Sequence, residues 1–496
     1  MTPPAVFEQV IDASGVAGRI EALLPAGARR RQLSVRTLLL GMLVALAGGR
    51  PAHLARVLGA LLALPAATRR RLGVLACWKH GPHLLTCRQV EYTFGLVTRA
   101  LGKEEPDGLP SPGLQRICDL LLEATVPDPF RDASASLAVD WSDLETFSRP
   151  PPRGTRDCAD PEAHWGHRKN NLLHDEDELF YGYYLTAAVM VRDEGGPPVP
   201  ELARRMTLSS CGHDPVPAFV PVLTAMPAAG TPLGDVLADS GYSFRVAAHW
   251  ALPLRLAGAQ LVQDLNPLDR GPKGTHDGAI IASGNLYCPA APRTLPGLAP
   301  LAPGAGKEQA ADHDAKTAEA ARYKLGIHAG PGADGYSRVQ CPALAGKIRC
   351  PLRPQSMTLD RDRPEILQPP EYPQACCTQA TITVPPEVNA KTRQEHDYPG
   401  PAWRRSYARR TAAERVFATV KDPAASDTAH GWCRLMGTSP LMLFTAALLA
   451  VRNQRILNAW NKRQEDNARR AAKGLPPKTR KRRRKTLAVL ATAAPP

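Results

Sequence analysis

The chain has 496 residues, of which 44% are apolar, enough for roughly two to four compact units. Its longest apolar stretches, residues 38–49 and 441–451, are about a dozen residues each, whereas a membrane-crossing helix needs about 20, so we expect no membrane partner. Eleven cysteines without an N-terminal signal pattern favour reduced thiols in a cytoplasmic protein over a disulfide framework.

The positive charge is concentrated near the C-terminus. The net charge is +15, and residues 452–496 hold fourteen Lys or Arg against two acids, a local net of +12, which leaves 15 − 12 = +3 for residues 1–451. Such a tail suits DNA phosphates, which bind cations with release of counterions. The alternative is a solvated tail that reflects an arginine-rich composition. We predict that residues 461–496 form a basic tail, disordered unless bound.

Residues 1–125 are predicted to be helical. Ser34 is placed to cap an apolar run at 35–46 that stops at Gly48, and further helical periodicity follows at 54–64 and 90–101. Clusters of arginine occur among these helices, at 29–31 and 69–71. A helical DNA-binding domain fits this pattern, and a plain helical bundle with charged corners fits it almost as well.

The pattern changes near residue 126. A short helix is predicted at 246–252, closed by Pro253. The predicted strands cover residues 137–139, 183–191, 220–223, 236–238 and 259–262. Strands that alternate with helices indicate an α/β sheet, and residues 126–264 are assigned to the first part of a core of this class.

A loop-rich region and a return to helix complete the chain. Residues 265–400 are rich in Gly, Pro and Cys with short β-like pieces such as 381–384, which predicts an inserted domain. Helical character returns at 404–421 and 440–460, so residues 401–460 are predicted to be C-terminal helices of the core.

Two acids follow predicted buried strands. Asp140 comes directly after the run at 137–139, and Asp239 directly after the run at 236–238. A carboxylate at the C-terminal end of a buried strand is held rigidly and faces the crevice where sheets bind ligands. Either aspartate on its own is more typical of a turn or a helix cap.

A third acid lies in a polar stripe on a predicted helix. At about 100° per residue, Tyr407, Arg410, Glu414 and Lys421 fall within about 60° of one another, beside an apolar face. One helix could therefore bury its aliphatic side against the sheet and present these four side chains to a groove. The alternative is an ordinary amphipathic helix with a solvated polar face.

The Y-x2-R-x3-E-x6-K spacing of these residues resembles the signature of bacterial insertion-sequence DDE transposases. VDWSD and LADSGYS resemble the first and second Asp blocks of that family, and FYGYYLTAAV at 180–189 is similar to the strand after the first block. The resemblance covers roughly residues 135–265 and 400–455. It implies a ribonuclease-H-like catalytic core, an N-terminal helical domain that binds transposon ends, and an insertion between the second Asp and the Glu.

The resemblance also implies an activity: metal-dependent cleavage of DNA at transposon ends, then strand transfer into target DNA. Asp140, Asp239 and Glu414 would hold Mg²⁺ or Mn²⁺, and Tyr407, Arg410 and Lys421 would bind DNA. The implied partners are terminal inverted repeats and target DNA, bound by a homodimer in the cytoplasm at the nucleoid. The alternatives are a catalytically silent, transposase-derived DNA-binding protein, and a metal-dependent nuclease that joins no strands.

Cysteines in the predicted insertion allow a second kind of metal site. Three of them precede a proline, and a zinc site would stabilise a segment poor in core residues. No CxxC pair is present, so buried free thiols are the alternative. The candidate zinc ligands are Cys288, Cys341, Cys350 and Cys376.

Overall fold

The structure is a computed structural model that describes residues 3–25, 31–78, 81–152, 155, 157–169, 177–302, 304–332, 334–422 and 425–478. The chain divides into two compact units, Met1–Asn453 and Gln454–Pro496. None of the described helices is long and apolar enough to cross a membrane.

The N-terminal part of the chain is helical, as predicted. Ser34 caps the third helix by accepting a hydrogen bond from the backbone N–H of Thr37, and the other two predicted helices are also present. Arg29 and Arg30 lie outside the described residues. The elements are α1 (Pro3–Ser14), α2 (Val16–Leu23), α3 (Val35–Ala47), α4 (Leu54–Leu62), α5 (Ala66–Arg71), the hairpin β1 (Leu75–Trp78) and β2 (Gly81–Leu84), α6 (Cys87–Leu101), α7 (Pro112–Glu123) and α8 (Asp128–Arg131).

A six-stranded mixed sheet follows, which confirms the α/β class. Its order is β4-β5-β3-β7-β8, and β6 also pairs with β5. Strands β3, β7 and β8 are parallel, and β5 is antiparallel to β3, β4 and β6. The strands are β3 (Leu137–Glu145), β4 (His164–Lys169), β5 (Asp177–Met190), β6 (Ala203–Ser210), β7 (Asp235–Ala238) and β8 (Gln260–Gln263).

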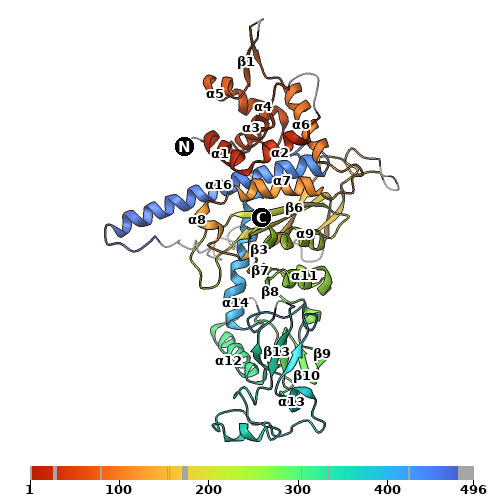
Figure 1. Ribbon diagram of the computed structural model, residues 1–496, viewed down its shortest axis with the longest axis vertical. Coiled ribbons are helices and arrows are strands. Elements are labelled where there is room, and N and C mark those ends of the chain that lie inside the picture. Colours follow the sequence, from red (N-terminus) through yellow and green to blue (C-terminus); the bar gives the residue numbers. More distant parts are fainter. Residues whose placement is uncertain are drawn as a thin grey trace, which may run out of the picture. The chain divides into compact units, whose positions relative to one another are not determined.

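Helices cover both faces of this sheet because alternate side chains of a strand point to opposite faces. Val139 and Val236 share one apolar cluster with residues of α9 (Pro215–Thr224), α10 (Ser240–Ser243) and α11 (Ala251–Leu256). Their neighbours Ala138 and Leu237 belong to the main core, with α7 and the C-terminal helices. In Figure 1, α7 lies on one side of β6 and α9 on the other.

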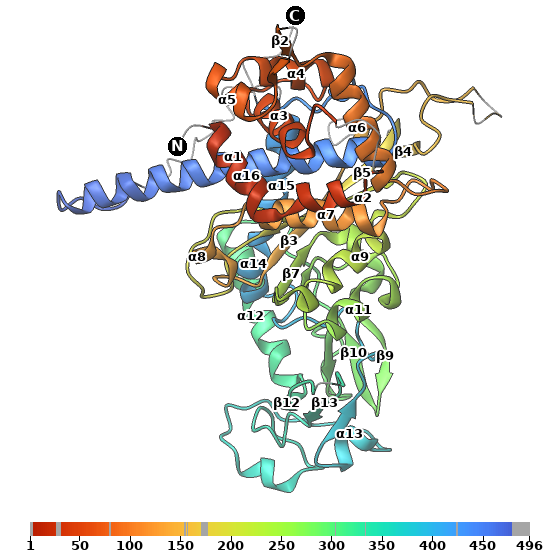
Figure 2. The ribbon, with the colours of Figure 1, turned by 45° about the horizontal axis from the view of Figure 1, so that its top comes forward.

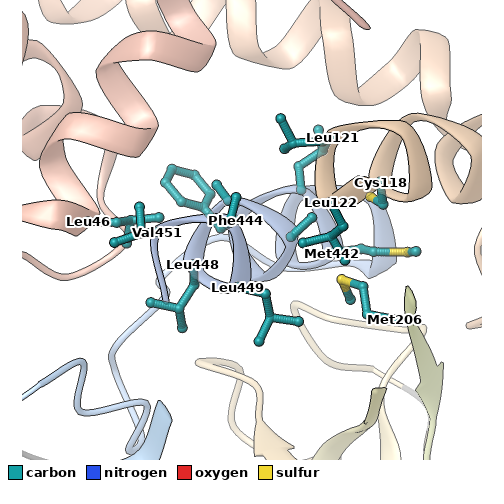
Figure 3. Close-up of a cluster of buried hydrophobic side chains, with 14 of the residues drawn as sticks. Leu46, Cys118, Leu121, Leu122, Met206, Met442, Phe444, Leu448, Leu449 and Val451 are labelled. Atoms are coloured by element: carbon teal, nitrogen blue, oxygen red, sulfur yellow. The ribbon is translucent and has the colours of Figure 1, made fainter. Parts of the chain in front are cut away.

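The apolar first part of α16 (Thr438–Ala471) joins the N-terminal helices to the sheet. The Phe444 ring packs at a tilt against the ring of Phe94 in α6, with 5.5 Å between ring centroids. Figure 3 shows Met442 of α16 beside Leu122 of α7 and Met206 of β6. The N-terminal helices therefore share one continuous hydrophobic core with the sheet.

Three local predictions were wrong. Residues 220–223, expected to be a strand, lie in α9, which Asp214 caps; a short apolar run does not distinguish a buried strand from a buried helix. Pro253 was expected to close a helix at 246–252, but it lies in the first turn of α11, where a missing N–H costs nothing. β3 was expected to end at Asp140 and continues to Glu145.

Two small sheets, the long helix α12 and the short helix α13 form the insertion. Its loop-rich, β-containing character was predicted, and the helix α12 was not. Figure 2 shows these elements gathered in one region of the ribbon. The first antiparallel sheet has the order β11-β10-β9 and the second β12-β13-β14. The elements are β9 (Pro272–His276), β10 (Ala279–Ala282), β11 (Asn285–Tyr287), α12 (Lys307–Tyr323), β12 (Gly326–Ala329), β13 (Ser337–Gln340), α13 (Ala375–Thr378) and β14 (Ile382–Val384).

The C-terminal helices differ from prediction in two respects. The helix expected at 404–421 consists of α14 (Pro401–Tyr407), a 3₁₀ turn (Ala408–Arg410) and α15 (Thr411–Lys421). The tail predicted to be disordered from residue 461 is helical to Ala471, since eight of the eleven residues at 461–471 are Ala, Arg, Lys, Gln or Glu, which favour helix. Residues 479–496 lie outside the described part of the chain.

Candidate active site

Asp140 lies within β3, and Asp239 directly follows β7, the parallel strand beside it. In the register of β3 and β7, Ala138 pairs with Leu237, and each aspartate comes two residues later in the chain. Because strand side chains alternate, Asp140 points to the same face as Ala138, which is the face covered by α15, and the extended backbone at Asp239 continues the line of β7.

The environment of Asp140 favours its protonated form. Burial, followed by the charge of Asp239, raises the pKa of Asp140 to about 7. Two groups act in the opposite direction: the backbone N–H of Trp141, which donates to Oδ1 of Asp140 at 2.8 Å, and the Arg410 guanidinium. Two carboxylates that share a partly buried site repel each other unless a cation lies between them. A bound divalent cation would relieve this repulsion.

Asp239 is fixed by the turn that follows β7. Its side chain caps α10 by accepting a hydrogen bond from the backbone N–H of Gly241 at 2.8 Å. Burial raises the pKa of Asp239, and the Arg410 guanidinium together with the N–H groups of Gly241 and Tyr242 partly offsets this rise. The second aspartate is therefore held by local backbone geometry.

Gly241 gives this turn its close packing. A Cβ at this position would lie 2.6 Å from the Trp141 ring and 2.9 Å from Asp239 Oδ1. We expect Gly241→Ala to displace the ring or the carboxylate and to lower the free energy of unfolding by roughly 1–3 kcal/mol in chemical denaturation. The control is Gly18→Ala in α2, where a Cβ meets open space and the protein should gain up to about 1 kcal/mol. Equal effects of the two substitutions would contradict the packing described here.

Glu414 lies on α15 near both aspartates. Its charge raises the pKa of Asp140 and of Asp239, as a carboxylate close to both must. Its side chain is 49% exposed and forms an ion pair with Arg410, one turn earlier. Strand β3, strand β7 and helix α15 thus bring three carboxylates into one electrostatic environment.

Arg410 lies at the centre of this environment. Its side chain is 15% exposed, it pairs with Glu414, and it lowers the pKa of both aspartates. Its guanidinium lies 5.4 Å from the centre of the Tyr407 ring, which in turn stacks on Trp403 at 4.7 Å. Among the described residues, its buried Nε has no hydrogen-bond partner, so one donor remains for a ligand.

Lys421 lies apart from these groups. Its Nζ is 2.5 Å from Oδ1 of Asp143, which also binds Arg168. Burial would raise the pKa of Asp143, but hydrogen bonds and charges from Lys421 and Arg168 outweigh it and lower this pKa. In this structure Lys421 therefore fastens the end of α15 to β3.

The pKa values of Asp140 and Asp143 are shifted in opposite directions, which predicts opposite pH effects. Between about pH 4 and pH 7, folded Asp140 keeps a proton that the unfolded chain loses, so this group costs stability as pH rises. We expect Asp140→Asn to stabilise the metal-free protein by roughly 1–3 kcal/mol at pH 8 and by nothing near pH 4. Asp143→Asn, the control, should destabilise it at pH 8. Denaturant melts across this range test both; a pH-independent effect of Asp140→Asn would contradict the expected shift.

Sequence reasoning missed two supporting residues. Asp264 directly follows β8, as Asp239 follows β7, and it accepts a hydrogen bond from the Tyr398 hydroxyl at 2.6 Å. Arg409 Nη2 lies 2.5 Å from Asp235 at the start of β7, and this pair is buried. The strand-end position was a signal for Asp264, whereas no pattern pointed to Arg409.

As they stand, the described His, Cys, Asp and Glu side chains form no group of three or more that could hold a metal ion. At the candidate active site, the Glu414 carboxylate is directed to Arg410. In comparisons with protein-family models, curated proteins and solved structures, the chain matches none of them.

Proposed function

We propose that the chain is a DDE transposase with a ribonuclease-H-like core, which cleaves DNA at transposon ends and joins the cut strand to target DNA. The observation that carries the proposal is the convergence of Asp140, Asp239 and Glu414 around Arg410, from two adjacent parallel strands and the helix that packs on them. Their residue types and order also match the signature found in the sequence.

The donor set fits Mg²⁺ or Mn²⁺, which prefer carboxylate oxygens and keep positions open for water and phosphate. Asp140 and Asp239 form the fixed part of the set, because one lies within a strand and the other is held as a helix cap. Glu414 can join them by giving up its ion pair with Arg410, because its own side chain is half exposed.

The metal ions, when bound, would activate the attacking oxygen and stabilise the leaving oxygen of an in-line displacement at phosphorus. Arg410 would use its free Nε–H, and the N–H groups released by Glu414, to hold a non-bridging phosphate oxygen. Tyr407 would orient Arg410 through its ring face and offer a surface for a base.

DNA contacts outside this centre follow from charge and from the reaction. Lys421 can bind a DNA phosphate only if it gives up its ion pair with Asp143. We therefore propose that its main role is to position α15 and that phosphate binding is secondary. Processing two transposon ends requires two active sites, which favours a homodimer on DNA that carries both terminal repeats. A chain with this substrate would act at the nucleoid.

The proposal is tested with linear DNA that contains the regions flanking the gene. Wild-type protein with Mg²⁺ should release a fragment end and join it to a second DNA, with both products absent when EDTA is added. Cutting without joining would instead indicate a nuclease, and binding without cutting would indicate the catalytically silent DNA-binding protein.

A further inference from the structure

The four cysteines expected to bind zinc lie in different segments of the insertion. Cys288 directly follows β11 of the first small sheet, and Cys341 directly follows β13 of the second. Cys350 lies in a loop beside the β-bridge between Arg349 and Glu365. Cys376 and Cys377 are neighbours in α13, which precedes β14. These cysteines therefore sit at the junctions between both sheets and the connecting loops.

The thiols are buried and close to one another. All five are less than 8% exposed, and Cys288, Cys341 and Cys350 share one apolar cluster. Burial raises the pKa of Cys288 to about 12, and charges on Cys341, Cys377 and Cys350 would raise it further, which requires them to be neighbours. Cys350 is affected in the same way by Cys341 and Cys377.

Several donors are placed to stabilise negative charge on these sulfurs. The backbone N–H of Ala290 lowers the pKa of Cys288 against the effect of burial, and the N–H of Leu352 does the same for Cys350. Both donors lie two residues after the cysteine they serve. The Arg353 guanidinium also favours the charged forms of Cys350 and Cys377. Such outer groups orient and stabilise thiolate ligands of a metal.

We propose that Cys288, Cys341, Cys350 and one sulfur of the adjacent pair Cys376 and Cys377 form a four-thiolate zinc site that connects the two small sheets of the insertion. Zn²⁺ takes four sulfur ligands in a tetrahedron, each thiol losing its proton on binding. The thiols would rotate toward a common centre, since no ready-made site exists among the described residues. The benefit is structural, because the two apolar clusters of the insertion are small.

The sequence predicts Cys376 as the fourth ligand, and the structure places both Cys376 and its neighbour Cys377 near the other thiols. The charge of Cys377 raises the pKa of Cys288 and of Cys350, and the charges of Cys288 and Cys341 raise the pKa of Cys376. The Cys376 sulfur lies 3.8 Å from that of Cys377 and close to Gly278, where a Cβ would be 3.3 Å away. The adjacent pair thus offers two sulfurs, either of which can supply the fourth ligand.

The test uses the full chain, expressed with added zinc and purified under reducing conditions without chelator. Elemental analysis should find about one zinc per chain, released when a mercurial reagent modifies the thiols. Replacing zinc with Co²⁺ should produce the near-ultraviolet charge-transfer absorption of thiolate–cobalt bonds. Zinc content should fall at least tenfold in Cys341→Ser and in the double variant Cys376→Ser/Cys377→Ser, and it should stay unchanged in Cys118→Ser, which lies in α7.

Wild-type measurements keep the proposal falsifiable if a variant fails to fold. A wild-type chain without zinc, a cobalt form without thiolate absorption, or iron in place of zinc would each overturn it. Unchanged zinc content in the double variant Cys376→Ser/Cys377→Ser would show that this pair supplies no ligand and would overturn the four-thiolate site. The measurements need neither DNA nor Mg²⁺, so their outcome is independent of the proposed transposase activity.

Discussion

Glu414→Gln is expected to reduce DNA cleavage at least a thousandfold while DNA binding stays within about twofold. The amide cannot supply the charge that a divalent ion needs, and metal ions contribute several kcal/mol to such displacements, which corresponds to three or more decades in rate. Because the Glu414 side chain is half exposed and is not part of a hydrophobic core, the fold should remain intact. The measurement is cleavage of end-containing DNA beside a gel-shift titration.

The matched control is Glu387→Gln, which neutralises an exposed acid of the insertion. Its cleavage rate should match that of the wild type. If Glu414→Gln cleaved at the wild-type rate, the assignment of this carboxylate would be wrong. If Glu414→Gln lost DNA binding together with cleavage, its role would be structural.

Removing residues 462–496 is expected to weaken DNA binding about 10²–10⁴-fold at 0.15 M salt, to the same extent for every sequence. This segment carries twelve Lys or Arg and two acids, a net charge of 12 − 2 = +10. Each phosphate contact contributes about 0.9 to the slope of log K against log salt, so the slope should flatten by several units. Fluorescence anisotropy over a salt series measures both quantities.

A chain that ends at residue 478 separates the helix from the charge beyond it. It keeps α16 to Ala471 and loses six Lys or Arg, so its salt slope should lie between those of the full chain and the longer truncation. An unchanged slope in both truncations would show that the tail makes no phosphate contacts. A loss confined to one DNA sequence would indicate base recognition.

Much of the sheet could be predicted because its sequence signals are local. The run at 236–238 is short, apolar and closed by a turn, and it forms β7 as predicted. Residues 220–223 are equally apolar but follow the cap Asp214 and two prolines that suit a helix start, so they form α9. Strand β6 was missed, because ARRMTLSS carries two arginines whose burial depends on Glu123 of a distant helix.

The sequence predicted which residues belong to the candidate site better than it predicted their contacts. Helical periodicity placed Tyr407, Arg410 and Glu414 together, and the structure brings them together. It grouped Lys421 with them as well, but the structure pairs this residue with Asp143, an acid on a strand far away in the sequence. Tertiary ion pairs of this kind leave no periodic signal in the chain.

The most direct test of the central claim measures divalent-ion binding itself. Manganese titration of the wild-type protein, followed by electron paramagnetic resonance, should show bound Mn²⁺ that Mg²⁺ displaces. In Asp140→Asn and Asp239→Asn the affinity should fall at least tenfold, and in Asp143→Asn it should stay unchanged. Equal Mn²⁺ binding by wild type and by the two site variants would contradict a shared metal site formed by these carboxylates.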